Sequence, residues 1–319
     1  WELSLIPMYF LIGGWGDAHG TYTFLGRTLP WRIYAALKFF LVGVLSSALL
    51  LFGMSLVYGT TGEYTFAGIR QATTAGLGAE PAFILGVLLV LVGFGFKIAA
   101  VPFHFWAPDT YEGSPLPVAA YLSVGSKGAG FVGLLTTCYL AFAGVRDIWG
   151  PALWALAALT MTLGNLTALR QSNVVRLLGY SSVAHAGFIL TALVAGRGGI
   201  GDMWFYLATY ALQVLGAFTV AAVVSGDGAG RSPLSHWTGL GRRSPWLAAA
   251  MTLMLLAMGG IPLTAGFAGK VAVFRAAIDA GYLWLVIVAV LATVAGLFFY
   301  LRVVVAMYLS DPDESAEVL

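Results

Sequence analysis

Nine apolar runs constrain this chain more than any other feature of its sequence. A helix needs about 20 mainly apolar residues to cross a bilayer. Only 9% of the residues are charged and 60% are hydrophobic, whereas a soluble domain carries about 25% charged residues. We therefore predict an all-α polytopic membrane protein, in which the first run is the end of a span that begins before Trp1. The runs cover residues 1–13, 32–58, 82–107, 115–144, 150–169, 174–196, 202–225, 246–277 and 281–309.

Two of these runs are irregular. The third, at 82–107, carries glycines before Lys97 and Pro102 after it. The eighth, at 246–277, carries four glycines and a proline before Lys270. As a single helix its 32 residues would extend about 48 Å, against roughly 30 Å of hydrocarbon. We predict helices broken at mid-membrane in both runs.

The spacing of the two breaks predicts an internal repeat. The interrupted runs lie five spans apart, and paired interrupted spans point to a transport site between structural repeats. An odd number of spans inverts one repeat relative to the other. We therefore expect one membrane domain over 1–319, with most of a first five-helix repeat at 1–144, a second repeat at 150–309, and an acidic loop or tail at 310–319.

Lysines are placed unusually. All four lie within predicted spans: Lys38, Lys97, Lys127 and Lys270. Insertion scales assign about 2.5–3.5 kcal/mol to a lysine at the centre of a membrane helix, so such a residue is a functional hypothesis by default. Burial disfavours the ammonium form, which lets a lysine load and release a proton. Snorkelling to the interface is the alternative, mainly for Lys38 near the start of its span.

Three further residues extend this proton-transfer hypothesis. Glu2 is the one acid of the fourteen that lies in a predicted span and not in a loop, at a span edge or in the tail. Its distance from a lysine would modulate that lysine's proton affinity. His185 lies mid-span beside two serines and is either a proton relay or a hydrogen-bonded core histidine. His104, near Asp109, is a candidate for proton uptake. We expect Asp109 and Glu112 to shape a loop turn.

Other chemistries have no motif here. The glycine-rich stretches lack a preceding strand, the histidines lack metal-ligand spacing, and no nucleophile–base motif is present. The net charge of +2 is too small to suggest a nucleic-acid partner. We predict no cofactor and no metal in this chain.

Arginine counts predict the orientation. Eight arginines lie in one set of alternate loops and span ends and four in the other, and the richer side is cytoplasmic by the positive-inside rule. The loops at 14–31, 106–115, 170–176 and 226–245, together with the acidic tail, are then expected in the cytoplasm.

Five stretches resemble the antiporter-like subunits of respiratory complex I, the proton-translocating NADH:quinone oxidoreductase. They run over nearly the whole chain, and within the family Lys270 argues against subunit M, which tends to have Glu there. The stretches are Phe96–Pro115, Ser123–Lys127, Gly164–Gln171, Arg176–Gly187 and Gly260–Lys270.

This resemblance implies a function and a setting. The family has fourteen helices in two inverted five-helix repeats, of which the fifth to the thirteenth would be present. Glu2 matches the glutamate paired with the third-span lysine, Lys97 the central pumping lysine, Lys127 the connecting lysine, and Lys270 the lysine near the outlet. FMN, iron–sulfur clusters and quinone are expected in partner subunits, beside sister antiporter-like subunits, in a bacterial inner membrane.

Two alternatives remain. Subunits of multisubunit sodium/proton antiporters and of membrane-bound hydrogenases share this fold. A structural scaffold with vestigial lysines is the alternative from another class.

Overall fold

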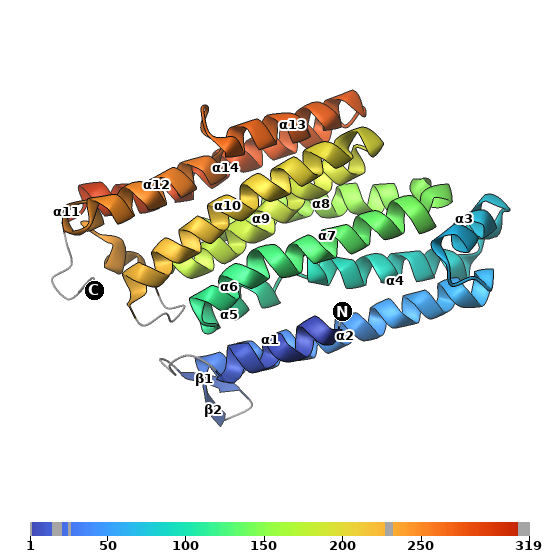
Figure 1. Ribbon diagram of the computed structural model, residues 1–319, viewed down its shortest axis with the longest axis horizontal. Coiled ribbons are helices and arrows are strands. Elements are labelled where there is room, and N and C mark those ends of the chain that lie inside the picture. The colour runs from blue at the N-terminus through green and yellow to red at the C-terminus, as the bar shows by residue number, and fades with distance from the viewer. Residues whose placement is uncertain (1, 15–20, 25–26, 227–231, 312–319) are drawn as a thin grey trace.

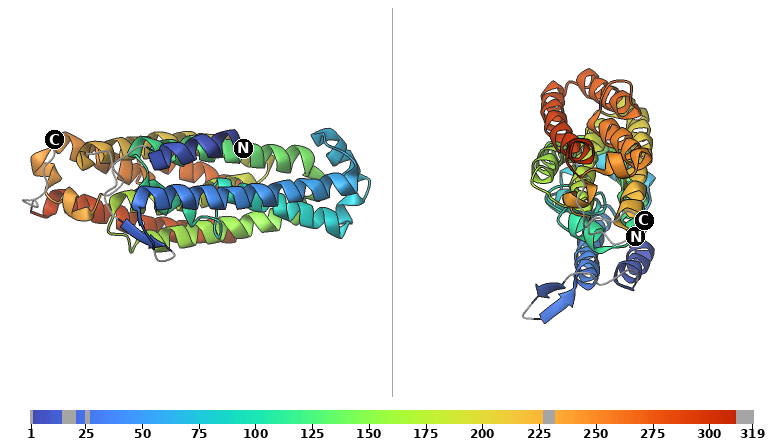
Figure 2. Two further views of the ribbon diagram at one scale, coloured as in Figure 1. Left: turned by 90° about the horizontal axis from the view of Figure 1, so that it is seen from below. Right: turned by 90° about the vertical axis from the view of Figure 1, so that its left-hand side faces the viewer.

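The chain folds into an elongated helical bundle (Figures 1 and 2). The computed structural model describes residues 2–14, 21–24, 27–226 and 232–311. Each predicted apolar run corresponds to a helix or to a broken pair of helices. The main helices are α1 (Glu2–Gly14), α2 (Trp31–Thr61), α4 (Pro81–Lys97), α5 (Trp106–Gly113), α6 (Leu116–Tyr121), α7 (Lys127–Thr136), α8 (Arg146–Ala168), α9 (Val174–Val194), α10 (Ile200–Ser225), α12 (Pro245–Gly259), α13 (Ala265–Asp279) and α14 (Leu283–Leu309).

Length and composition support the membrane assignment. Five helical stretches of the described chain are long and apolar enough to cross a bilayer: α2, Leu116–Ala141, α9, Arg197–Ser225 and α14. The helices α4 and α12 are shorter apolar helices. The all-helical membrane fold predicted from the sequence is confirmed, whereas the count of nine spans and the inverted repeat remain predictions.

Both irregular runs are interrupted. α4 ends at Lys97 and α12 ends at Gly259, and each ends in the same hydrogen-bonded cap. At the first break the amide of Ala99 donates to Phe96 O and that of Ala100 to Gly95 O; at the second, Gly260 and Ile261 donate to Ala257 O and Leu256 O. This is the Schellman arrangement, which requires a positive φ at its first donor residue. The broken helices are therefore confirmed, and they end alike.

Backbone conformation marks the same two places. Ala99 has φ +58° and Leu263 has φ +73°, and these are the non-glycine residues with positive φ in the described chain. Gly260, with φ +79°, supplies the cap of the second break without a Cβ penalty. Strained residues of this kind persist where surrounding structure holds them, often at functional sites.

The first break is enclosed by protein. Residues 98–101 are at most 4% exposed. The amide of Val101 donates to Oγ1 of Thr160 on α8 at 2.9 Å, and the indole of Trp106 donates to Phe96 O at 3.1 Å. Irregular backbone at membrane depth is tolerated only where protein or water satisfies it. α8 and α5 provide this satisfaction.

α9 is the central helix of the bundle. It packs against α5, α8, α10, α13 and α14, and every residue from Val174 to Val194 except Arg176 and Tyr180 is buried. The side chain of Asn173 caps its first turn by accepting from the amide of Arg176. Polar groups on α9 are consequently enclosed by helices on all sides.

The segments that connect the long helices contain secondary structure of their own. β1 (Thr21–Phe24) and β2 (Arg27–Pro30) form an antiparallel hairpin at the end of the bundle that also holds α11 (Leu240–Arg243), while α3 (Phe66–Thr74) lies at the opposite end (Figure 1). The prediction that 106–115 is a loop was wrong, because residues Trp106–Gly113 form α5 against α2 and α9.

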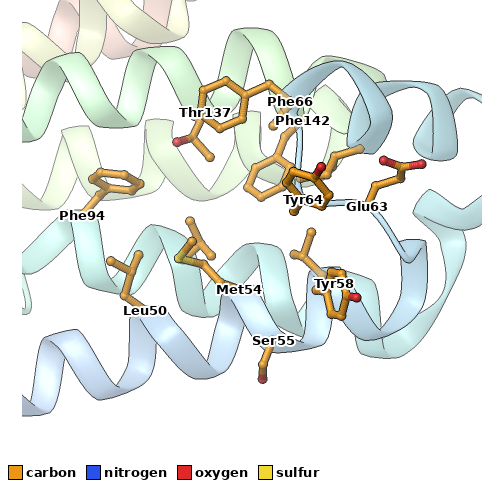
Figure 3. A pocket seen from close by; sticks show the side chains of 14 residues that line it. Leu50, Met54, Ser55, Tyr58, Glu63, Tyr64, Phe66, Phe94, Thr137 and Phe142 are labelled. Atoms are coloured by element: carbon orange, nitrogen blue, oxygen red, sulfur yellow. The ribbon is translucent and has the colours of Figure 1, made fainter.

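An apolar groove of about 420 Å³ lies between α2, α3, α4 and the π-helical turn Thr137–Ala141 that follows α7 (Figure 3). Leu50, Met54 and Phe94 line it, and Tyr58 and Glu63 stand towards its α3 end. It contains no lysine or histidine. The groove is therefore separate from the polar residues considered below.

Thr160→Val should destabilise the protein. The substitution keeps the shape of the side chain but leaves the buried Val101 amide without its acceptor, a loss of about 1–3 kcal/mol. Thr136→Val is the matched control, because that hydroxyl bonds only its own helix at Val132 O. Thermal unfolding in detergent should show a lower midpoint for Thr160→Val than for Thr136→Val, and equal midpoints would contradict the role assigned to Thr160.

Candidate functional site

Lys97 and Lys127 lie on facing helices. Lys97 ends α4 at the first break and is 6% exposed, while Lys127 begins α7 and is 1% exposed. A methyl group built at Gly130, one turn after Lys127, would lie 3.0 Å from Cγ of Lys97. The absence of a side chain at Gly130 thus lets the lysine stem pack against α7. A π-helical turn at Leu122–Ser126 directly precedes Lys127, an irregularity frequent at functional sites.

Lys127 is bound to the central helix. Its Nζ donates to both the carbonyl and the hydroxyl oxygen of Ser182 on α9, each at 2.5 Å. The hydroxyl of Tyr210, on α10, donates to the same Ser182 Oγ at 2.8 Å. The ammonium group therefore has two oxygen acceptors in a buried setting, as a buried charge requires.

His185 lies between two tyrosine hydroxyls. Its Nδ1 is 2.9 Å from the hydroxyl of Tyr206 on α10, and its Nε2 is 3.2 Å from that of Tyr300 on α14. Tyr300 also makes a short hydrogen bond to Ser181. The ring of Tyr210 stacks on the imidazole at 4.8 Å. We call these seven residues the central cluster: Lys127, Ser181, Ser182, His185, Tyr206, Tyr210 and Tyr300.

Lys270 lies at the second break. Its Nζ donates to Gly259 O at the end of α12, at 3.1 Å. A helix C-terminus carries partial negative charge, which favours a cation there. The same Nζ lies 4.9 Å from the ring centroid of Phe188, which in turn is 5.9 Å from the ring of His185. The second break thus brings a lysine close to the central cluster.

A charged clamp joins α2, α5 and α9. Lys38 is ion-paired with Asp109, and Arg176 pairs with Asp109 at 2.6 Å and Glu112 at 2.8 Å. Asn173 Nδ2 donates to Glu112 at 3.2 Å. We call Lys38, Asp109, Glu112 and Arg176 the charged clamp. The expectation that Asp109 and Glu112 shape a loop turn was wrong, because both lie on α5 and neutralise cations of neighbouring helices.

The remaining predicted residues are placed differently. His104 lies in the segment between α4 and α5, with its ring 6.3 Å from that of Tyr180. Its Nδ1 is buried and has no hydrogen-bond partner among the described residues. Asp109 is bound by Lys38 and Arg176 of the clamp, and the role of His104 in proton uptake remains a prediction. The side chain of Glu2 lies outside the described residues.

The tyrosines, the clamp acids and Arg176 were missed from the sequence. Tyr206 and Tyr210 are four residues apart within an apolar run, so a helix places them on one face. That spacing was a usable signal. The pairing of Lys38 with Asp109, which are 71 residues apart, has no local signal.

This arrangement suits proton transfer. Amines, an imidazole and hydroxyls all exchange protons, and a histidine changes charge near neutral pH. Within the described residues, no group of three or more His, Cys, Asp or Glu side chains is placed to hold a metal ion. The chemistry available here is therefore that of a buried line of proton donors and acceptors.

Asp109→Asn should destabilise the protein, because Lys38 loses its carboxylate and Arg176 keeps only Glu112. We expect a loss of about 2 kcal/mol, below the 3–5 kcal/mol of a fully buried pair, since the Lys38 and Arg176 side chains are 21% and 26% exposed. Thermal unfolding in detergent would measure it.

Asp311→Asn is the matched control. It breaks the Arg242–Asp311 pair, whose side chains are 65% and 92% exposed, so its effect should stay within about 0.5 kcal/mol. Equal stability of the two variants would show that the clamp contributes no more than a surface ion pair.

Comparison with known proteins identifies the family. The sequence model described as NADH:quinone oxidoreductase/Mrp antiporter, TM, matches residues 1–296. NADH-quinone oxidoreductase subunit N of Mycobacterium tuberculosis is 47% identical over 282 residues, which cover 87% of this chain and 53% of that protein. Subunit N of Thermobifida fusca is 46% identical over 321 residues, covering 99% and 57%. The chain spans about half the length of these curated relatives.

Solved structures agree. A chain of respiratory complex I from Thermus thermophilus matches with a TM-score of 0.82 at 35% identity, covering 99% of this chain and 66% of that one. A chain of the Mrp complex from Dietzia matches with a TM-score of 0.86 at 25% identity, covering 100% and 57%. We interpret the stretch Pro108–Gly113 as favouring subunit N among the sister subunits, and the curated relatives carry that name. The chain is a multi-pass membrane protein and belongs to the NADH:quinone oxidoreductase/Mrp antiporter family.

Proposed function

We propose that this chain moves protons across a bacterial inner membrane as an antiporter-like subunit of a complex I-type NADH:quinone oxidoreductase. One observation carries the proposal: three buried lysines and the central cluster lie along the bundle between two broken helices. Ionisable residues inside a membrane are expensive and mark ion pathways. The similarity to subunit N is the reason for proposing this complex.

Each residue takes a role in this proposal. Lys97 and His104 receive protons from the cytoplasmic side, which the arginine count assigns to the end that holds α11 and the hairpin. Lys127 and His185 carry them along the central cluster, and Lys270 releases them at the second break. Lys38 takes part in the charged clamp beside the uptake site. Glu2 modulates the proton affinity of Lys97. The two breaks mark two inverted repeats.

Other subunits drive the movement. Each charge moved against 100 mV requires about 2.3 kcal/mol. Nothing in the sequence resembles a site for NADH, flavin or quinone, so FMN, iron–sulfur clusters and quinone belong to partner subunits. The expected neighbours in the membrane are sister antiporter-like subunits. On this proposal the chain is part of a translocase, and the chain itself carries no redox centre.

Lys97→Ala and Lys127→Ala should each lower proton pumping. Each removes a buried amine from the line, so protons moved per NADH oxidised should fall when the assembled complex is placed in vesicles and acidification is recorded. Arg275→Ala is the control, because its side chain is 83% exposed and should leave pumping unchanged. Normal pumping by normally assembled lysine variants would instead support a purely structural subunit.

A sodium/proton antiporter subunit is the second candidate. The match to a chain of the Mrp complex, with a TM-score of 0.86, favours it specifically. A membrane-bound hydrogenase subunit is a related possibility from the shared fold. Vesicles that contain the assembled complex distinguish them: sodium-dependent proton movement without NADH would establish the antiporter, and strict dependence on NADH oxidation would exclude it.

A further inference from the structure

An aromatic ring lies beside both the central cluster and Lys270. Phe188 on α9 contacts both, with its centroid 4.9 Å from Lys270 Nζ and 5.9 Å from the His185 ring. A phenyl ring carries no exchangeable proton. Within the described residues, no hydrogen bond joins the cluster to Lys270, whose bond goes to Gly259 O. Phe188 therefore cannot pass a proton from His185 to Lys270, and another polar group must do so.

A polar row on α10 leads around it. Tyr206, Thr209 and Gln213 succeed one another at helical spacing on the buried side of α10. This side meets α13: a methyl group at Gly269 would lie 3.0 Å from the Tyr206 ring and 3.1 Å from Thr209 Oγ1, and one at Gly266 would lie 3.0 Å from Gln213 Nε2. The row thus begins at a partner of His185 and ends at the first turn of α13.

Gln213 has an unused donor at this point. It is 5% exposed, and its Nε2 is buried without a hydrogen-bond partner in the described part of the chain. A buried donor left unsatisfied costs about 1–3 kcal/mol, and buried polar groups in native proteins are almost always satisfied by protein or ordered water. The amide therefore points to a small hydrogen-bonding ligand at the break.

The surroundings of the amide suit a water molecule. The first turn of α13 has amide groups without helical partners, of which the cap Thr264 satisfies that of Phe267. Lys270 lies one turn after Gly266, and its side chain bends back until Nζ bonds Gly259 O. Buried waters typically make about three hydrogen bonds to groups of this kind.

We propose that Gln213 is a positioning residue that holds a water between the α10 row and Lys270. This inference rests on the proposed function and adds a bypass of Phe188 to it. The water accepts a proton arriving along α10 while one of its own protons passes to the neutral amine of Lys270. The water is regenerated and the lysine becomes an ammonium.

Gln213→Leu tests this proposal in the assembled complex. The variant keeps the bulk but removes the amide, and pumping should fall roughly fivefold, the factor that the loss of one hydrogen bond corresponds to. Gln213→Asn, which keeps an amide N–H donor, should keep more of the pumping than Gln213→Leu. Leu212→Ala is the matched control on the outer side of α10, where Leu212 is 73% exposed. Pumping by Gln213→Leu equal to that of the control would overturn the proposal.

Two further measurements separate the possible failures. Lys270→Ala with normal pumping would reject the role of Lys270 in the proposed function, whereas loss of pumping there and normal pumping in Gln213→Leu would reject only the water bypass. A solved structure that resolves waters decides the case if Gln213→Leu does not assemble. A water within about 3.5 Å of the Gln213 amide is the expected result. A hydrogen bond from this amide to a protein group instead of water would overturn the proposal.

Discussion

A helix can be interrupted inside a membrane only if protein or water satisfies the backbone groups that the interruption exposes, and this requirement shapes the whole bundle. Both breaks meet it first by the same capping hydrogen bonds at the ends of α4 and α12. At the first break, Thr160 and the indole of Trp106 provide the rest. The helices that carry these groups are consequently held against the breaks, and a lysine lies at each.

The central helix α9 connects these two places. Its hydroxyls and imidazole bind Lys127 from α7 and the tyrosines from α10 and α14, so four spans share one buried polar interior. Burying such groups is unfavourable unless they bond one another, and satisfied networks of this kind also fix the packing of the helices around them. The same contacts that stabilise the bundle therefore provide the proposed proton route.

The charged clamp adds a second connection at the end of the bundle where we propose that protons enter. Two cations and two carboxylates from three helices neutralise one another beside His104. Because the clamp reaches α9 through Arg176, a change in its charge would act on the helix that carries His185. At the other end, Phe188 contacts both His185 and Lys270, and the buried polar row of α10 begins beside it at Tyr206.

The sequence by itself determined the membrane class, the positions of the apolar helices and the two breaks, because run length, glycine and proline act locally on the backbone. It also singled out Lys97, Lys127, Lys270 and His185, since a charge or an imidazole in an apolar run is conspicuous without knowledge of the fold. Only the tertiary structure decided what these groups bind. Residues from different helices meet in the ion pair of Lys38 with Asp109, in the hydrogen bond from Lys127 to Ser182, and where Gln213 lies against Gly266. Such contacts depend on how the helices rotate and pack against one another, which local patterns do not specify.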